Sequence, residues 1–175
     1  MTVDTDWLGP LWDAALKVRA HAHAPYSRFA VGAAVLDEQG RVHAGCNVEN
    51  AAYPQGWCAE TSALAAMVAA GGRHVRAVLV VGEAAEPVTP CGGCRQKLRE
   101  FAADDCPVIA ADGQGVRGRF TLGQLLPVSF GPQHLLHGPG DAHNGGAREP
   151  HPGAAPAPAP EATTTIHAGR PESAP

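Results

Sequence analysis

The sequence contains no long hydrophobic run, and no stretch approaches the roughly 20 apolar residues that a membrane-spanning helix needs. It also has no excess of positive charge, because 13 Lys and Arg stand against 17 Asp and Glu, for a net charge of −4. Proteins that bind nucleic acid usually carry a basic patch, which this balance does not indicate. The composition therefore excludes a membrane-embedded protein, argues against a nucleic-acid partner and favours a small neutral one.

Cysteine is scarce, with five residues in a chain of 175. The first six residues, MTVDTD, include acidic residues where a secretory signal peptide has basic ones, so we expect a cytoplasmic location. In that compartment cysteines serve as metal ligands, catalytic groups or buried thiols more often than as disulfides.

Apolar residues are unevenly spread along the chain. They make up 45% of it, enough for a globular core, but they thin out after Leu136. Nine of the 16 prolines lie from Pro132 onward. Such a segment cannot bury enough apolar surface to offset its ordering entropy. The sequence predicts one catalytic domain over residues 1–131 and a disordered, Pro/Ala-rich tail over residues 132–175.

Hydrophobic periodicity predicts the order of helices and strands. The predicted helices are residues 10–23, 58–70, 91–103 and 122–126, and the predicted strands are residues 29–36, 41–46, 77–81, 108–111 and 116–120. This order indicates an α/β fold, a three-layer α/β/α sandwich whose central mixed sheet has about five strands and helices on both faces.

Two cysteine motifs stand at the predicted starts of two helices. Cys58 begins one helix, and Cys91 and Cys94 form a C-x-x-C at the start of another. In the first turn of a helix this spacing can direct two thiolates at one ion, and the helix N-terminus lowers their pKa. Alone, a C-x-x-C also fits a redox pair or half of a structural zinc site. Cys46 and Cys106 lie in no ligand-like motif, so the three-thiolate site leaves a fourth zinc position open for water.

Glu60 stands two residues after Cys58. A non-ligand Glu, a Pro-Cys-x-x-Cys and a third ligand are the pattern of zinc deaminases. At this point the chain resembles the small zinc-dependent cytidine deaminase family. Five segments carry the resemblance, in family order between Leu8 and Leu136: residues 26–34 (YSRFAVGAA), 45–53 (GCNVENAAY), 58–60 (CAE), 89–96 (TPCGGCRQ) and 125–131 (LLPVSFG).

The resemblance implies an activity and an assembly. It implies hydrolytic deamination of cytidine and deoxycytidine to uridine and deoxyuridine, by a zinc-activated water and with release of ammonia, in pyrimidine salvage. Glu60 would carry the protons, and Cys58, Cys91 and Cys94 would hold one zinc per subunit. The family is typically a homotetramer.

The resemblance also assigns substrate contacts. Asn47 and Glu49 would hydrogen-bond the 3′-hydroxyl of the sugar, although both also suit a turn after a strand. Phe29 would pack on the pyrimidine ring, although it also suits a core strand position. Further contacts are implied by the same resemblance. The backbone N–H of Ala59 and the carbonyl of Thr89 would meet the edge of the base, and Tyr53 and Phe130 would reach the site of a neighbouring subunit.

Two alternatives stay open. A deaminase of a modified cytosine nucleoside, such as blasticidin S, would share the zinc motifs without needing Asn47 and Glu49. A non-enzymatic zinc-stabilised module would have four protein ligands and no use for Glu60. The chain departs from many family members at Thr61, where they carry Arg. We expect the two helix N-termini and Arg95 to offset the thiolate charge in its place.

Overall fold

The structure is a computed structural model that describes residues 6–136. Its centre is one five-stranded sheet in the order β2-β1-β3-β4-β5. The strands are β1 Val31–Asp37, β2 Val42–Cys46, β3 Val75–Gly82, β4 Pro107–Ala111 and β5 Val116–Thr121. The pair β3 and β4 is parallel and the other three pairs are antiparallel. The predicted mixed sheet is confirmed, and β5 is one of its two edges.

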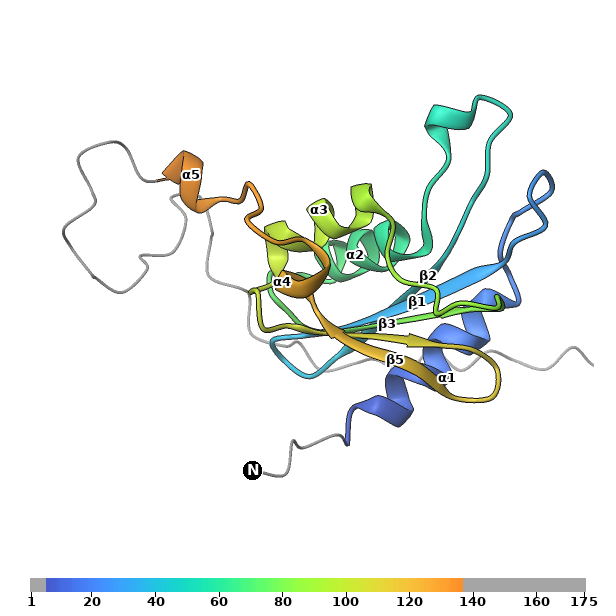
Figure 1. Ribbon diagram of the computed structural model, residues 1–175, viewed down its shortest axis with the longest axis horizontal. Coiled ribbons are helices and arrows are strands. Elements are labelled where there is room, and N and C mark those ends of the chain that lie inside the picture. The colour runs from blue at the N-terminus through green and yellow to red at the C-terminus, as the bar shows by residue number, and fades with distance from the viewer. Residues whose placement is uncertain (1–5, 137–175) are drawn as a thin grey trace, which may run out of the picture. The chain divides into compact units, whose positions relative to one another are not determined.

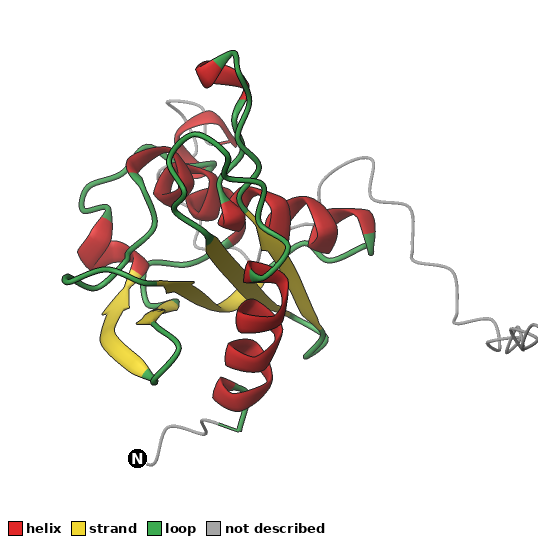
Figure 2. Ribbon diagram, turned by 90° about the vertical axis from the view of Figure 1, so that its right-hand side faces the viewer, coloured by secondary structure: helices red, strands yellow, loops and turns green. Residues whose placement is uncertain are grey.

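Helices cover both faces of this sheet (Figures 1 and 2). The helices within residues 6–136 are α1 Leu8–Arg19, the 3-10 helix η1 Tyr53–Gln55, α2 Ala59–Ala69, α3 Gly92–Phe101, α4 Leu122–Leu125 and α5 Gln133–Leu136. Figure 1 shows α1 on one side of the sheet and α2 and α3 on the other. The predicted three-layer α/β/α arrangement is therefore confirmed. None of the helices within residues 6–136 is long and apolar enough to cross a membrane.

The core lies in two layers, one on each face of the central strands. In β3, Val78 and Val80 belong to the cluster that packs with α2 and α3, whereas Leu79 and Val81 belong to the cluster that packs with α1. Successive side chains of a strand point to opposite faces, so a continuous apolar run is needed where both faces are covered. This requirement accounts for the continuous apolar run AVLVV at residues 77–81 in β3.

The first helix ends earlier than its periodicity predicted, at Arg19 instead of residue 23. The reason is a long-range pairing of His23, whose N–H donates to the carbonyl of Asn47 and whose carbonyl accepts from the N–H of Glu49. A residue paired in this way across another segment cannot continue the helix. Of the predicted tail, residues 132–136 belong to the described part and include α5, and residues 137–175 lie outside the described residues. The boundary after residue 131 stays a prediction.

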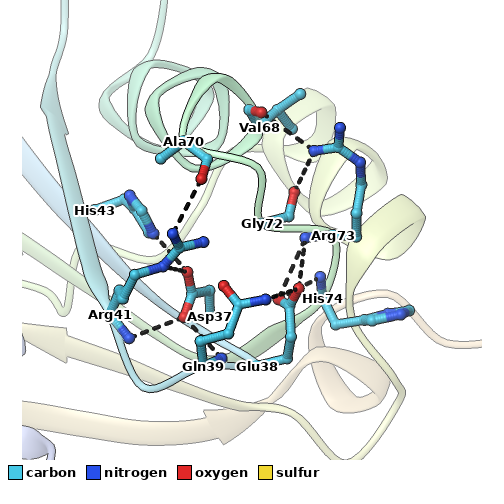
Figure 3. A network of polar contacts seen from close by, with 10 residues as sticks. All are labelled: Asp37, Glu38, Gln39, Arg41, His43, Val68, Ala70, Gly72, Arg73 and His74. Carbon is cyan, nitrogen blue, oxygen red and sulfur yellow. Dashed lines mark hydrogen bonds and ion pairs between the residues drawn. The ribbon is translucent and has the colours of Figure 1, made fainter. Parts of the chain in front are cut away.

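A buried carboxylate organises the far end of the sheet (Figure 3). The side chain of Asp37, at the end of β1, is fully buried. It accepts hydrogen bonds from the backbone N–H of Gln39 and of Arg41, from Nε of Arg41 at 2.7 Å and from His43 Nε2 at 2.7 Å. Arg41 also donates to the carbonyl of Ala70 at 3.0 Å, which ties the turn after β1 to the end of α2.

This network should make the stability of the protein depend on pH in acid. Burial raises the pKa of Asp37, but the hydrogen bonds from His43 and Arg41 outweigh it and hold the pKa at about 2, below the ordinary 3.8. Because the folded-state pKa is the lower one, the contribution is fully present above about pH 5 and is lost as pH falls through 2. The shift corresponds to about 2 kcal/mol.

We expect Asp37→Asn to lower the free energy of unfolding at pH 7 by about that amount or more, because the amide cannot satisfy all these donors. Urea denaturation at pH 7 and pH 3 measures it, and the loss should shrink at the lower pH. Asp105→Asn, at an exposed position, is the matched control. Equal stability of the two variants at pH 7 would contradict this role of Asp37.

Candidate metal centre and active site

Two helix starts converge at one end of the sheet. Both β2 and β3 are antiparallel to β1, so they run in the same direction and their carboxyl ends lie at the same edge. The chain leaves β2 through the segment that contains η1 and then enters α2, and it leaves β3 and then enters α3. Cys58 and Cys91 are the N-cap residues of these helices, with extended backbone (ψ 156° and 164°). The topology therefore brings both cysteine motifs together.

The three predicted ligands form one cluster. The sulfurs of Cys58, Cys91 and Cys94 all lie within 4.8 Å of one another, and the sulfurs of Cys58 and Cys91 are 3.6 Å apart. Tetrahedral zinc with Zn–S bonds near 2.3 Å places its sulfurs about 3.8 Å apart, so the donor set and its spacing fit zinc. No other group of three metal-binding side chains occurs in residues 6–136.

The thiols differ in acidity, because the hydrogen bond between Cys58 and Cys94 raises the pKa of Cys94 and lowers that of Cys58. The hydrogen bond from Cys94 lowers the pKa of Cys58 to about 6. A thiol that ionises near neutral pH is a ready metal ligand. Burial raises the pKa of Cys106 to about 12, which suits a buried thiol outside the metal cluster.

Glu60 lies beside the cluster, in the first turn of α2. It is 4% exposed, and its Oε2 is 3.4 Å from the sulfur of Cys94. Burial raises its pKa above the ordinary value for a glutamic acid. A raised pKa brings a carboxyl group closer to the operating pH, which suits general acid–base work in both directions.

Thr61 and Arg95 bear on the charge of the cluster. Thr61 faces it, with Oγ1 3.7 Å from the sulfur of Cys94. Arg95, which we expected to offset thiolate charge, donates to the carbonyls of Pro90 and Leu125 and to the hydroxyl of Thr89. Its guanidinium thus fixes the segment that leads into α3.

An open cavity of about 360 Å³ lies among the segments before β1 and after β2. It is lined by Tyr26, Ser27, Glu49, Asn50, Tyr53 and Gly56, the last only two residues before Cys58. Figure 1 shows both segments projecting beyond the same end of the sheet.

Glu49 is held firmly in the wall of this cavity. Its Oε2 accepts from the backbone N–H of Tyr26 at 2.9 Å and of Ser27 at 3.2 Å, and its Oε1 accepts from the Ser27 hydroxyl. The hydrogen bond from the Ser27 hydroxyl is the main reason why the pKa of Glu49 is lowered. An ionised carboxylate fixed in this way retains lone pairs for a ligand hydroxyl.

Asn47 has a structural role that its turn-like sequence context did not reveal. Its Oδ1 accepts from the N–H of Val31 and its Nδ2 donates to the carbonyl of Phe29, both at 2.9 Å. These bonds hold the start of β1, and one amide N–H remains available for a ligand.

Comparison with known proteins decides the family. The model of the cytidine and deoxycytidylate deaminase zinc-binding region matches residues 6–110. The chain belongs to this family. The cytidine deaminase of Sporosarcina psychrophila is 42% identical over 121 residues, which are 69% of this chain and 89% of the relative. The crystal structure of cytidine deaminase from Burkholderia pseudomallei has 44% identity and a TM-score of 0.66, and covers 70% of this chain and 98% of its own.

A third relative matches a similar share of this chain. The crystal structure of cytidine deaminase from Mycobacterium tuberculosis has 41% identity and a TM-score of 0.63, and covers 73% of this chain and 99% of its own. The family model describes a zinc-binding region, and the only cluster of three metal-binding side chains in the described residues is Cys58, Cys91 and Cys94. The chain is therefore a zinc protein of the cytidine deaminase family.

The remaining predicted site residues fall into two sets. Ala59 is the first residue of α2 and Thr89 precedes Cys91 by two residues, so both adjoin the metal cluster. Exposed aromatic side chains form the other set: Phe29 at 39%, Tyr53 at 77% and Phe130 at 57%. Tyr53 lines the cavity, whereas Phe29 and Phe130 are not among its lining residues.

Sequence reasoning missed two residues of this cytidine deaminase-family site. Ser27 lies inside a motif quoted for the resemblance, yet nothing in the motif indicated that its hydroxyl would bond Glu49. Lys97 donates to Thr61 at 3.0 Å beside the metal cluster. Its spacing of three residues from Cys94, which places the two on one side of α3, was the available indication.

Proposed function

We propose that this protein hydrolytically deaminates cytidine and deoxycytidine, giving uridine and deoxyuridine with release of ammonia. The observation that carries the proposal is the buried carboxyl of Glu60, 3.4 Å from a cysteine of a three-thiolate zinc cluster. Relatives 42% identical over most of their length and named cytidine deaminase support it.

The chain's own residues supply the proton transfers. When bound, zinc acts as a Lewis acid that lowers the pKa of a water molecule. Glu60 takes a proton from the attacking water and transfers it to N3 of the ring as the oxygen adds to C4. Glu60 then carries the second proton of that water to the exocyclic amino group, and the C4–N bond breaks to release ammonia.

The start of α2 and the segment before α3 would orient the base. The first N–H groups of a helix have no acceptor within it, so the N–H of Ala59 is available to an acceptor on the cytosine ring. The carbonyl of Thr89 would accept from the amino group. One donor and one acceptor fixed on two separate elements can select the edge of cytosine.

Glu49 is assigned to the 3′-hydroxyl of the sugar, and a matched pair of substrates tests it. Glu49→Ala should lower kcat/KM for cytidine about 10- to 100-fold, because a hydrogen bond to a charged group contributes about 1.5–3 kcal/mol. For 3′-deoxycytidine, which lacks the hydroxyl, the loss should be small. Asn47→Ala should show the same preference, together with a loss of stability from the bonds that it makes to β1.

Steady-state kinetics on both nucleosides measure these effects, and Glu49→Gln is the control that keeps a hydrogen-bonding side chain of the same length. An equal loss on cytidine and 3′-deoxycytidine would assign Glu49 to the structure of the loop and not to the sugar.

The two alternatives make different predictions. A deaminase of a modified nucleoside such as blasticidin S would turn that compound over in preference to cytidine. A zinc-stabilised module would use a fourth protein ligand, but the described residues group three cysteines beside a buried carboxyl. Direct competition between the two nucleosides separates the first alternative, and metal-edge spectroscopy separates the second.

The assembly is proposed as a homotetramer with one zinc per subunit, acting in cytoplasmic pyrimidine salvage. Large exposed side chains support an interface, since Tyr53 and Phe130 are more than half exposed and Val128 is fully exposed with φ at 51°. Tyr53 and Phe130 would reach the site of a neighbouring subunit. Light scattering should give a mass of four chains, and a monomer would overturn this assignment.

An absorbance assay of cytidine loss, with metal analysis of the same sample, tests the proposed function. Activity should rise in proportion to zinc content up to one zinc per chain. Zinc-loaded protein that turns over neither cytidine nor deoxycytidine would overturn the proposal.

A further inference from the structure

Lys97 and Thr61 connect the two helices beside the metal cluster. Lys97 Nζ on α3 lies 3.0 Å from Thr61 Oγ1 on α2, and the same Oγ1 lies 3.7 Å from the sulfur of Cys94. An ammonium group only donates hydrogen bonds, so the hydroxyl oxygen of Thr61 accepts from Lys97. The hydroxyl proton is then free to point at the sulfur. The contacts form a directed chain from Lys97 through Thr61 to Cys94.

The metal centre carries a negative charge that Lys97 can offset. Three thiolates carry −3 and a zinc ion +2, so the centre is net negative before any water ionises. The N-termini of α2 and α3 each offer the equivalent of about half a positive charge. Lys97 adds a whole unit, and the two contacts place it within the Debye length of about 8 Å at physiological salt.

We propose that Lys97 is a positioning residue of the zinc centre, which acts through the Thr61 hydroxyl to neutralise thiolate charge and to strengthen zinc binding. Lys97 supplies a positive charge next to Thr61, the position at which many family members carry Arg. Arg95 cannot do so, because its guanidinium is committed to other partners. The inference rests on the metal site of the proposed function, but zinc affinity tests it without any substrate.

A purely structural tether between α2 and α3 is the competing explanation. Lys97 is exposed, and an exposed polar contact of this kind contributes at most about 1 kcal/mol to stability. A tether would change the stability of the apo-protein without selecting the zinc-bound state. Charge neutralisation instead favours the bound state, because zinc binding gathers three thiolates and one zinc ion into a single net-negative centre.

Zinc affinity of the full chain, measured by competition with a chromophoric chelator, separates the two explanations. Lys97→Met should weaken zinc binding about tenfold, as expected for a unit charge at this distance in a dielectric between those of a protein surface and water. Lys97→Arg should restore most of the affinity. Lys17→Met is the matched control, since Lys17 is the only other lysine of the chain and lies exposed on α1, across the sheet.

Two further measurements test the relay through Thr61. Thr61→Val should weaken zinc binding by a similar factor, whereas Thr61→Ser should not. The double variant Lys97→Met with Thr61→Val should lose little more zinc affinity than either single variant, because Lys97 acts through the Thr61 hydroxyl. Raising the salt concentration to about 1 M should reduce the difference between wild type and Lys97→Met, since it shortens the Debye length to about 3 Å.

The inference is overturned if Lys97→Met and Lys17→Met both bind zinc like the wild type, or if Lys97→Arg binds as weakly as Lys97→Met. Circular dichroism of each variant reports its fold. If Lys97→Met does not fold, the comparison of Thr61→Val with Thr61→Ser decides the question. Loss of turnover with unchanged zinc affinity would refute this inference and leave the proposed function standing.

Discussion

Glu60→Gln should retain zinc and fold but lose nearly all deamination. The side chain keeps its size and its place beside Cys94, but an amide cannot take a proton from water and pass it on. General acid–base catalysis alone contributes about 10²–10⁴ in rate, and Glu60 is proposed to act in both proton transfers. We therefore expect kcat to fall by at least about a thousandfold.

Turnover, zinc content and thermal unfolding measured on the same preparation decide this prediction. Glu100→Gln is a suitable control, because Glu100 is an exposed carboxyl on the neighbouring helix α3. Near wild-type kcat in the Glu60 variant would remove this residue from the mechanism. Lost zinc would show instead that it supports the metal site.

Cys91→Ala and Cys94→Ala should each lose zinc and unfold at a markedly lower temperature. Metal binding is coupled to folding, since the ligands converge only when both helix starts are in place. Removing one thiolate leaves two ligands, too few for a tetrahedral zinc site. A loss of several kcal/mol would lower Tm by about 10 °C or more in a chain of this size.

Metal analysis and thermal denaturation measure both effects, and chelation of zinc from the wild type should produce a similar fall in Tm. Cys46→Ala is the control, because Cys46 lies at the end of β2 outside the cluster and should keep its zinc. Full zinc occupancy in both ligand variants would refute the site.

Much of the fold could be predicted, because the core helices and strands are long and their apolar residues follow the spacing that each type of element requires. The run in β3 is buried on both faces and shows no competing pattern. The end of α1 could not be predicted, because the pairing of His23 with Asn47 and Glu49 decides it. Local periodicity contains no information about a partner that distant in sequence.

The same distinction separates the site residues that could be predicted from those that could not. The three cysteines and Glu60 stand within a few residues of two helix starts, so short motifs contain them. Ser27 and Lys97 act through side-chain contacts with residues 22 and 36 positions away. Each is an ordinary surface residue until the fold brings its partner close.

The edge position of β5 has a consequence for the behaviour of the protein in concentrated solution. An edge strand presents unpaired backbone groups to which a strand of another molecule can add, which is a route to aggregation. Along β5, Arg117 and Arg119 are both exposed, and only the first has a carboxylate partner, Asp112, among the ion pairs of residues 6–136. A strand from a second copy would bring its own arginines against the same edge. Like charges therefore oppose the pairing of two β5 edges.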